Sequence, residues 1–160
     1  MAKIGIGERA PDFSAIATGN QTVTLSEFSG KNVVLYFYPK DNTPGCTRQA
    51  QAFNASAAKF AKQNTVVIGV SRDSLRSHDG FCSKYALNFP LISDQDGALC
   101  DLFGVIKPKT MFGKLVQGIE RSTFLIDGAG TIRREWRGVK VDGHVDDVLA
   151  AVASLQNDQR

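Results

Sequence analysis

The sequence predicts an α/β fold in which a central mixed β-sheet is flanked by helices. A continuously apolar run, residues 33–38, and a second strand-like run, residues 65–70, enclose a helical pattern, and a strand–helix–strand unit of this length joins parallel strands through a right-handed crossover. Farther along the chain, two strand-like segments, 122–126 and 131–136, flank the turn sequence Asp-Gly-Ala-Gly, which is typical of an antiparallel hairpin. A sheet that contains both kinds of pairing is mixed, and the helices are expected to cover its faces.

The N-terminal part, residues 11–28, is expected to form a β-hairpin. The sequence Thr-Gly-Asn at 18–20 is a turn signal. The apolar residues on its two sides are Phe13, Ile16, Val23 and Leu25. The run 33–38 that follows is apolar throughout, which is typical of a strand buried on both faces.

Two longer segments show helical spacing of apolar residues. The first begins at Pro44, and spacings of three and four mark one buried stripe along it. That stripe consists of Ala50, Phe53, Ala57, Phe60 and Ala61. The second segment, 71–87, ends at Asn-Phe-Pro and is followed by a short strand at 91–92. The side chains that cluster on one side of it are Leu75, His78, Phe81, Cys82 and Tyr85.

The remaining elements are a short helix, a long loop and a C-terminal helix. The short helix is expected to carry Leu99, Leu102 and Phe103 on one face, with Cys100 beside that face. Residues 104–118 are expected to form a long irregular connection, and loops of this length often carry function. The last helix begins near His144 and has one buried stripe. The residues of that stripe are Val145, Val148, Leu149, Val152 and Leu155.

The composition fits one globular domain that spans residues 1–160. Of these residues, 42% are hydrophobic and 22% are charged. A chain of this length buries roughly 68–70% of its unfolded surface, so its core needs no disulfide or metal. The three cysteines are an odd number and include no C-x-x-C pair, so a structural disulfide framework is not expected.

Charge and hydropathy argue against two classes of partner. The formal net charge is +3, without a run of five like charges, whereas nucleic-acid binding needs a clustered basic face. No apolar run approaches the roughly 20 residues that span a membrane, and the N-terminus lacks the apolar segment of a signal peptide. We therefore expect no nucleic-acid partner, no membrane partner and no cofactor. The expected location is cytoplasmic, where thiols are kept reduced.

Cys46 is the strongest candidate for a reactive residue. Thr43 suits the N-cap of the helix, where its hydroxyl can accept a bond from a free backbone N–H, and Pro44 suits the first helical position. Cys46 then lies in the first turn, and the free N–H groups and helix dipole there favour thiolate over thiol. The alternative is a small buried residue at a helix start. The position just past the carboxyl end of a central parallel strand favours the reactive thiol.

The residues around Cys46 resemble a known active-site signature. Pro39, Thr43 and Cys46 fit the pattern P-x-x-x-T-x-x-C, and the longer segment 37–47 extends the likeness. Three further segments agree with it, namely 7–13, 89–94 and 118–127. On these residues the chain resembles the peroxiredoxins, within them the bacterioferritin comigratory protein or peroxiredoxin Q subfamily. The resemblance covers nearly the whole chain and implies a thioredoxin-like fold.

The resemblance implies a thiol-dependent peroxidase that reduces hydrogen peroxide and organic hydroperoxides, in antioxidant defence and cell redox homeostasis. Cys46 is then the peroxidatic cysteine, whose thiolate attacks a peroxide oxygen and becomes a sulfenic acid. The Thr43 hydroxyl and the backbone N–H of Cys46 are the expected donors to the peroxide, and Arg121 supplies a permanent cation. Pro39 is expected to shield the site from water. For Arg121 alone, the alternative is a surface ion pair with Glu120 or another neighbouring residue.

The resemblance also bears on which cysteine resolves the sulfenic acid. Many members of the subfamily carry that cysteine five residues after the peroxidatic one, where this chain has Gln51. Another branch places it on the following long helix, about where Cys82 lies. The implied partner of Cys46 is therefore Cys82, in an intramolecular disulfide that needs local unfolding if the two Cα atoms lie more than about 7 Å apart. The alternative for Cys82 is a core cysteine, and Cys100 is expected to be structural or incidental.

Other functions are compatible with some of these sequence features. A general thiol–disulfide oxidoreductase is disfavoured because C-x-x-C is absent, whereas a redox sensor or holdase would react with peroxide only once. A one-cysteine peroxidase would use an external thiol for resolution. His78 and Cys82, four positions apart, could form half of a metal site, but no second half has metal-ligand spacing. The resemblance favours a monomer recycled by thioredoxin or a similar dithiol reductant.

Overall fold

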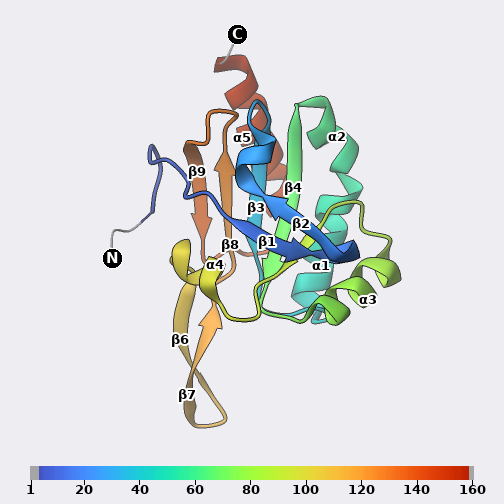
Figure 1. The fold of residues 1–160 in the computed structure, drawn as a ribbon, viewed down its shortest axis with the longest axis vertical. Coiled ribbons are helices and arrows are strands. Elements are labelled where there is room, and N and C mark those ends of the chain that lie inside the picture. Colours follow the sequence, from blue (N-terminus) through green and yellow to red (C-terminus); the bar gives the residue numbers. More distant parts are fainter. Residues whose placement is uncertain (1–3, 159–160) are drawn as a thin grey trace.

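The computed structural model describes residues 4–158 and is shown in Figure 1. The strands are β1 (Ser14–Ala17), β2 (Gln21–Thr24), β3 (Asn32–Phe37), β4 (Thr65–Ser71), β5 (Leu91–Ser93), β6 (Ile106–Met111), β7 (Lys114–Ile119), β8 (Ser122–Ile126) and β9 (Ile132–Arg137). The helices are α1 (Pro44–Ala55), α2 (Ala57–Lys62), α3 (Leu75–Tyr85), α4 (Ala98–Leu102) and α5 (His144–Asp158). Short 3-10 turns lie at Thr18–Asn20 and Leu25–Phe28.

A mixed sheet of seven strands has the order β2-β1-β5-β4-β3-β8-β9. β4 pairs in parallel with both β3 and β5, whereas β8 is antiparallel to both β3 and β9. At the other side of the sheet, β1 is antiparallel to β5 and to β2. The predicted mixed sheet, its strand–helix–strand unit and the N-terminal hairpin are thereby confirmed.

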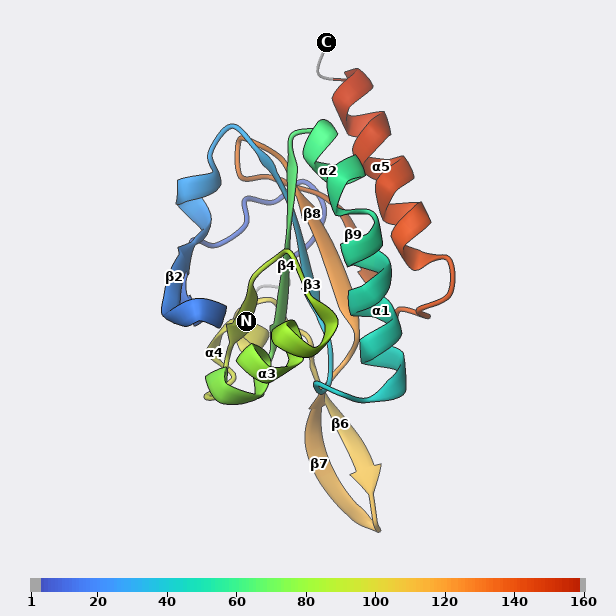
Figure 2. The same cartoon turned by 90° about the vertical axis from the view of Figure 1, so that its right-hand side faces the viewer.

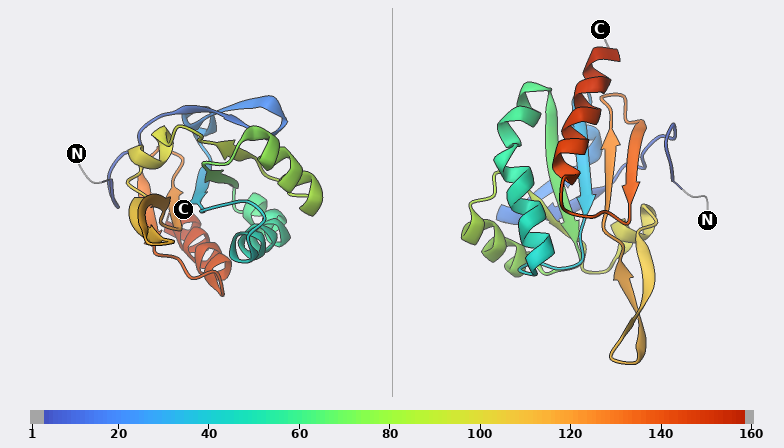
Figure 3. Two further views of the ribbon diagram at one scale, coloured as in Figure 1. Left: turned by 90° about the horizontal axis from the view of Figure 1, so that it is seen from below. Right: turned by 180° about the vertical axis from the view of Figure 1, so that it is seen from behind.

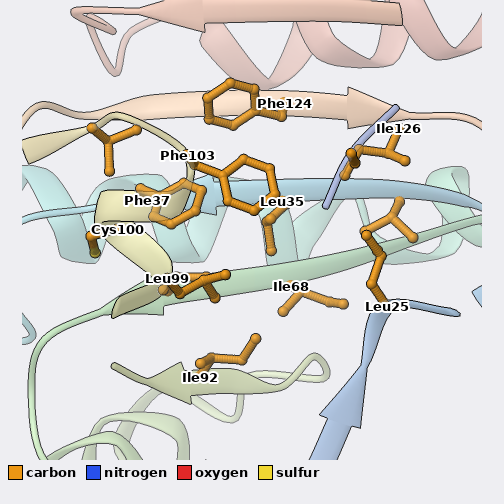
Figure 4. Packing of buried hydrophobic residues seen from close by; sticks show 14 of the residues in the cluster. Leu25, Leu35, Phe37, Ile68, Ile92, Leu99, Cys100, Phe103, Phe124 and Ile126 are labelled. Carbon is orange, nitrogen blue, oxygen red and sulfur yellow. The ribbon is translucent and has the colours of Figure 1, made fainter. Parts of the chain in front are cut away.

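β3 lies at the centre of the sheet, and its alternate side chains enter two cores. Val33, Leu35 and Phe37 belong to the first core, part of which is drawn in Figure 4. Val34 and Tyr36 belong to the second core, to which α1, α2, α3 and α5 contribute. Figures 2 and 3 show α1, α2 and α5 together on one side of the sheet. Because both faces are covered, every residue of β3 is buried.

Cys100 of α4 packs in the first core, whereas Leu102 faces outward. Cys100 is fully buried, whereas Leu102 is 41% exposed. The prediction that Leu99, Leu102 and Phe103 share one buried face is therefore wrong at Leu102. The reason is that α4 has only five residues and ends at Leu102, so Phe103 enters the core from beyond the helix. Figure 4 shows Leu99, Cys100 and Phe103 on the core side of this segment.

Two helical segments of the second core have other bounds than expected. The single helix expected after Pro44 is divided at Ser56, whose N–H donates to the carbonyl groups of Ala52 and Phe53. α3 begins after Ser74, at the end of the stretch 71–74 where its start is expected, because Ser74 Oγ accepts a hydrogen bond from the backbone N–H of Ser77 at 3.1 Å. It ends at Tyr85, two residues before the expected end. α5 begins at His144, as predicted. No helix within residues 4–158 is both long enough and apolar enough to cross a membrane.

The segment 104–118 differs most from expectation, because it contains a hairpin instead of an irregular loop. β6 and β7 pair antiparallel and project from the body of the molecule (Figures 1 and 2). Phe112 and Gly113 form the turn with φ values of 53° and 77°, and two-residue hairpin turns of type I′ need positive φ at both positions. Phe112 and Leu115 are 98% and 72% exposed. The hairpin therefore lacks the alternation of buried and polar residues by which strands are predicted.

Candidate active site

Cys46 occupies the first turn of α1, directly after the loop that leaves the carboxyl end of β3. Pro44 takes the first helical position, as predicted, and Cys46 is buried with only 1% of its surface exposed. Its Sγ accepts a hydrogen bond from Nη2 of Arg121 at 3.4 Å. The structure therefore joins a thiol at a helix N-terminus to a guanidinium from 75 residues farther along the chain.

Thr43 lies at the N-cap position of α1, but its hydroxyl does not cap the helix. Instead, Thr43 Oγ1 donates to the carbonyl oxygen of Lys40 at 2.8 Å. The predicted cap is therefore wrong, because the hydroxyl closes the preceding turn. The expectation that this hydroxyl donates to the peroxide also changes. With its hydrogen used by Lys40, Thr43 offers lone pairs and can accept a hydrogen bond.

Gln49 orients Arg121 and is a functional residue that the active-site signature does not include. Nη1 of Arg121 donates to Oε1 of Gln49 at 2.6 Å, which directs Nη2 toward Cys46. Gln49 is fully buried three residues after Cys46, so the two share one face of α1. A buried polar residue at that helical spacing from the cysteine was the available signal. The suggested pairing of Arg121 with Glu120 is not found, since Glu120 lies 3.8 Å from Lys107.

Gly45 gives the guanidinium room to approach the helix. A Cβ atom at this position would lie 3.3 Å from Nη2 of Arg121, which is tighter than an ordinary contact. A larger residue there would press on the group that contacts Cys46. Pro39, which begins the loop, is half-buried, and its shielding of the site stays a prediction.

Tyr36 places a buried hydroxyl beneath this site. Its ring stacks on Phe53 of α1 with centroids 4.6 Å apart, and its hydroxyl has no hydrogen-bond partner among the described residues. Burial, followed by the electrostatic effect of the nearby Cys46 and Cys82 side chains, raises the pKa of Tyr36 well above its usual value. The hydroxyl is therefore neutral and has a hydrogen to donate. Both cysteines contribute to the electrostatic environment of the Tyr36 hydroxyl, a proximity that no local sequence pattern indicates.

Cys82 lies on α3, half-buried, with its Sγ 4.0 Å from the carbonyl oxygen of Phe89. Burial is the main cause that raises the pKa of the Cys82 thiol. Cys82 packs against the second core, to which Cys46 belongs, and the two thiols are not bonded to each other. Each sulfur thus has its own partner, a guanidinium for Cys46 and a carbonyl for Cys82. The structure shows the reduced arrangement.

Cys100 lies far from this chemistry, in the first core. Burial, and then the neighbouring Asp94 carboxylate, raise the pKa of its thiol strongly. The backbone N–H of Cys100 donates to Oδ2 of Asp94 at 2.8 Å. A buried thiol with a raised pKa is a poor nucleophile, which agrees with a structural role.

One group of described residues gathers metal-ligating atoms, namely Asp41, Asp73 and His78, with those atoms all within 4.8 Å of one another. Both ring nitrogens of His78 face acceptors, since Nδ1 is 2.7 Å from Oδ2 of Asp41 and Nε2 is 2.9 Å from the carbonyl oxygen of Ile92. A metal needs a free lone pair on one ring nitrogen. The group is therefore a hydrogen-bonded cluster, and it does not include Cys82.

Comparison with known proteins identifies the family. The AhpC/TSA family matches residues 6–135. A relative named Peroxiredoxin Bcp, from Xanthomonas campestris, is 54% identical over 138 residues, which are 86% of this chain and 86% of that protein. Peroxiredoxin Bcp of Bacillus subtilis is 47% identical over 152 residues, or 95% of this chain and 97% of the relative. The chain is a peroxiredoxin of the AhpC/TSA family.

Solved structures of similar proteins agree with this peroxiredoxin over most of its length. Xanthomonas campestris Peroxiredoxin Q (structure F4) has a TM-score of 0.87 at 50% identity, covering 90% of this chain and 91% of that one. A mutant of Xylella fastidiosa PrxQ has a TM-score of 0.90 at 44% identity, covering 96% and 98%. The predicted thioredoxin-like fold and peroxiredoxin family are confirmed. As a peroxiredoxin, the chain is a thiol peroxidase and hence an oxidoreductase.

Proposed function

We propose that this peroxiredoxin reduces hydrogen peroxide and organic hydroperoxides with Cys46 as the peroxidatic cysteine and Cys82 as the resolving cysteine. The observation that carries the proposal is the 3.4 Å contact between Nη2 of Arg121 and Sγ of Cys46 at the N-terminus of α1. A cationic donor and a helix dipole both favour the thiolate that must attack the peroxide. A solved relative supports the substrate class, because its description concerns the alkyl peroxide reduction activity of Xanthomonas campestris bacterioferritin comigratory protein.

In the first step, the Cys46 thiolate attacks the terminal oxygen of the hydroperoxide. The O–O bond breaks, sulfur becomes a sulfenic acid, and the departing alkoxide or hydroxide takes up a proton to leave as alcohol or water. Thr43 Oγ1 accepts a hydrogen bond from the attacked hydroxyl, since its own hydrogen is used by Lys40. The Arg121 guanidinium and the backbone N–H of Cys46 donate to the oxygen atoms as negative charge develops.

In the second step, the Cys82 thiolate attacks the sulfenic sulfur of Cys46. A disulfide forms, and the displaced hydroxide leaves as water. Structures of two serine variants of Xanthomonas campestris Peroxiredoxin Q support this pairing, because the two replaced cysteines are separated along that chain by the same number of residues as Cys46 and Cys82. Thioredoxin or a similar dithiol protein then reduces the disulfide and restores both thiols.

We also propose that residues 1–160 form a single domain that works as a monomer in the cytoplasm, where dithiol reductants are available. No nucleic-acid or membrane partner is proposed, since positive and negative residues are interleaved along the chain. Antioxidant defence and redox homeostasis follow from the reaction itself. Pro39 is proposed to limit access of water to the Cys46 thiolate.

The proposal is tested by peroxide turnover coupled to thioredoxin, thioredoxin reductase and NADPH, with a peptide map of the oxidised protein. We expect Cys46→Ser to abolish peroxide consumption and Cys82→Ser to abolish both the Cys46–Cys82 peptide and thioredoxin-dependent turnover. Cys100→Ser is the matched control and is expected to keep both. If Cys46→Ser consumed peroxide as fast as the wild type, the assignment of the nucleophile would be wrong.

A further inference from the structure

A buried polar cluster connects the segment that carries Cys46 to the helix that carries Cys82. Asp41 lies in the loop between β3 and α1, five residues before Cys46, and His78 lies on α3, four residues before Cys82. His78 Nδ1 is 2.7 Å from Oδ2 of Asp41, and the two side chains are 0% and 1% exposed. A direct contact therefore joins the segment that leads into the helix of Cys46 to the helix that carries Cys82.

The hydrogen bonds around His78 fix the geometry of this buried salt bridge. Nδ1 of His78 faces a carboxylate oxygen of Asp41, and Nε2 faces the carbonyl oxygen of Ile92 at 2.9 Å. Because a backbone carbonyl and a carboxylate both accept, each ring nitrogen is placed to donate a hydrogen bond. Burial by itself would raise the pKa of Asp41, but hydrogen bonds from His78, Tyr38 and Ser77 outweigh it and leave that pKa lowered.

Further bonds fasten Asp41 at both its side chain and its backbone. Its carboxylate also accepts from the Tyr38 hydroxyl at 2.6 Å and from Ser77 Oγ at 2.8 Å. Its backbone N–H donates to Oδ2 of Asp73 at 2.9 Å, just before α3. The loop between β3 and α1, residues 38–43, leads into the helix that carries Cys46 and is called the Cys46 loop. It is thus bound to α3 at Ser77 and His78 and to the segment that precedes α3 at Asp73.

The geometry points to Asp41 and His78 as positioning residues for the resolving step. We propose that this ion pair keeps the Cys46 loop and α3 in the reduced arrangement, and that its rupture sets the rate at which Cys82 reaches the Cys46 sulfenic acid. The inference rests on the proposed pairing of these two cysteines. It gives Asp41 and His78 a role that is separate from peroxide attack by Cys46 and from metal binding.

In the reduced protein, each of the two sulfurs has a separate partner, so the contact between Asp41 and His78 must break before the disulfide forms. Cys46 is 1% exposed and in contact with Arg121, while the Cys82 sulfur is turned toward Phe89. To form the disulfide, the Cys46 loop must leave its place, α3 must open, or both must occur. Asp41 lies on the loop and His78 on α3, so either movement pulls their contact apart.

The Asp41–His78 pair also affects how easily Cys46 is overoxidised. Before Cys82 attacks, a second peroxide can oxidise the Cys46 sulfenic acid to sulfinic acid; this peroxide gives up one oxygen and leaves as water or alcohol. A more stable Asp41–His78 pair lengthens the lifetime of the sulfenic acid, whereas a broken pair shortens it. The pair therefore sets how much peroxide the enzyme tolerates before Cys46 is overoxidised.

The test compares His78→Asn and Asp41→Asn with wild type in rapid-quench mass spectrometry after one equivalent of hydrogen peroxide. We expect disulfide formation to become about tenfold faster in His78→Asn, because a buried ion pair present only before opening adds to the barrier. The peroxide concentration that gives half sulfinic acid should rise by the same factor. Arg76→Gln removes a charge from the exposed side of α3 and is expected to behave as wild type.

Unchanged disulfide formation in a folded His78→Asn protein would overturn the inference while leaving the peroxidase mechanism in place. Failure of the wild type to form the Cys46–Cys82 disulfide would instead overturn the proposed function. If the variants do not fold, amide hydrogen exchange of the wild type, followed by NMR, decides. We expect the Asp41 amide to be protected in the reduced protein and to lose its exchange protection in the disulfide form. A protected Asp41 amide in the disulfide form would overturn the inference.

Discussion

Gln49 Oε1 accepts a 2.6 Å hydrogen bond from Nη1 of Arg121, and this bond aims the other guanidinium nitrogen at the sulfur of Cys46. Arg121 lies between β7 and β8, so it approaches α1 from a distant part of the chain. A guanidinium has a long, flexible stem and needs such a partner to keep one orientation. The reactivity of Cys46 is therefore expected to depend on a neutral amide that does not touch the sulfur.

Gln49→Ala is expected to lower the second-order rate constant for hydrogen peroxide by about tenfold to a hundredfold, because Arg121 loses the partner that orients it. Stopped-flow measurement of Cys46 oxidation gives the rate constant. Gln49→Glu keeps an acceptor for Nη1 and should recover most of the rate. Gln51→Ala, on the exposed side of the same helix, is the matched control. Equal rates for Gln49→Ala and Gln51→Ala would contradict the role given to Gln49.

Tyr36 and Tyr38 are expected to respond oppositely to loss of the hydroxyl. The Tyr36 hydroxyl is buried without a described partner, so Tyr36→Phe should raise the free energy of unfolding by about 1 kcal/mol. The Tyr38 hydroxyl donates to Asp41 at 2.6 Å, so Tyr38→Phe should lower it by about 1–3 kcal/mol. Urea unfolding of the reduced proteins measures both. A loss of stability in Tyr36→Phe would show that its hydroxyl does have a partner.

His144 is expected to make the protein less stable as pH falls from about 6.5 toward 4. Burial is the main cause that lowers the pKa of His144 from 6.5 to about 4. Between these values the unfolded chain binds a proton that the folded protein does not, so the free energy of unfolding falls with pH by roughly 2–3 kcal/mol. Above pH 6.5 the contribution is complete, because histidine is neutral in both states.

Urea unfolding between pH 4 and 7.5 tests this dependence by comparing wild type with His144→Gln. The variant cannot take up the extra proton, so its stability should fall less over that range. It is also expected to be less stable at pH 7, because the bond between Thr123 Oγ1 and His144 Nε2, 2.8 Å long, changes geometry. Parallel pH profiles for the two proteins would refute the assignment.

Gly69 in β4 is expected to tolerate no side chain. A Cβ atom there would lie 2.6 Å from Cδ2 of Leu91 and 3.0 Å from the Tyr36 ring. Gly69→Ala should therefore lower the free energy of unfolding by about 1–3 kcal/mol through overpacking. Gly80, on α3, has open space at the same position, and Gly80→Ala should be neutral or stabilising by up to about 1 kcal/mol. Thermal unfolding separates the two, and a Gly69→Ala protein as stable as wild type would contradict the packing argument.

Much of the fold follows from local patterns in the sequence. Most residues of β3 and β4 are apolar because both faces of these strands are covered. The Gly, Asn and Asp residues between the strands of the two predicted hairpins favour turns. The projecting hairpin differs from the predicted loop because residues 114–117 of β7 are exposed and its turn uses Phe112, an unusual residue for positive φ. The buried face of α4 was misassigned because one helical turn is too short for periodicity to be reliable.

The sequence by itself determined the chemistry that Cys46 can perform, since a strand, a turn and Thr-Pro-x-Cys place a thiol at a helix N-terminus through local interactions alone. Only the tertiary structure decided what surrounds that thiol. It brought Arg121 and Gln49 together, used the Thr43 hydroxyl for the loop and not for a cap, and joined Asp41 to His78. The physical reason is that these contacts join residues far apart in the sequence. Their geometry depends on how the sheet and helices pack, which no local pattern records.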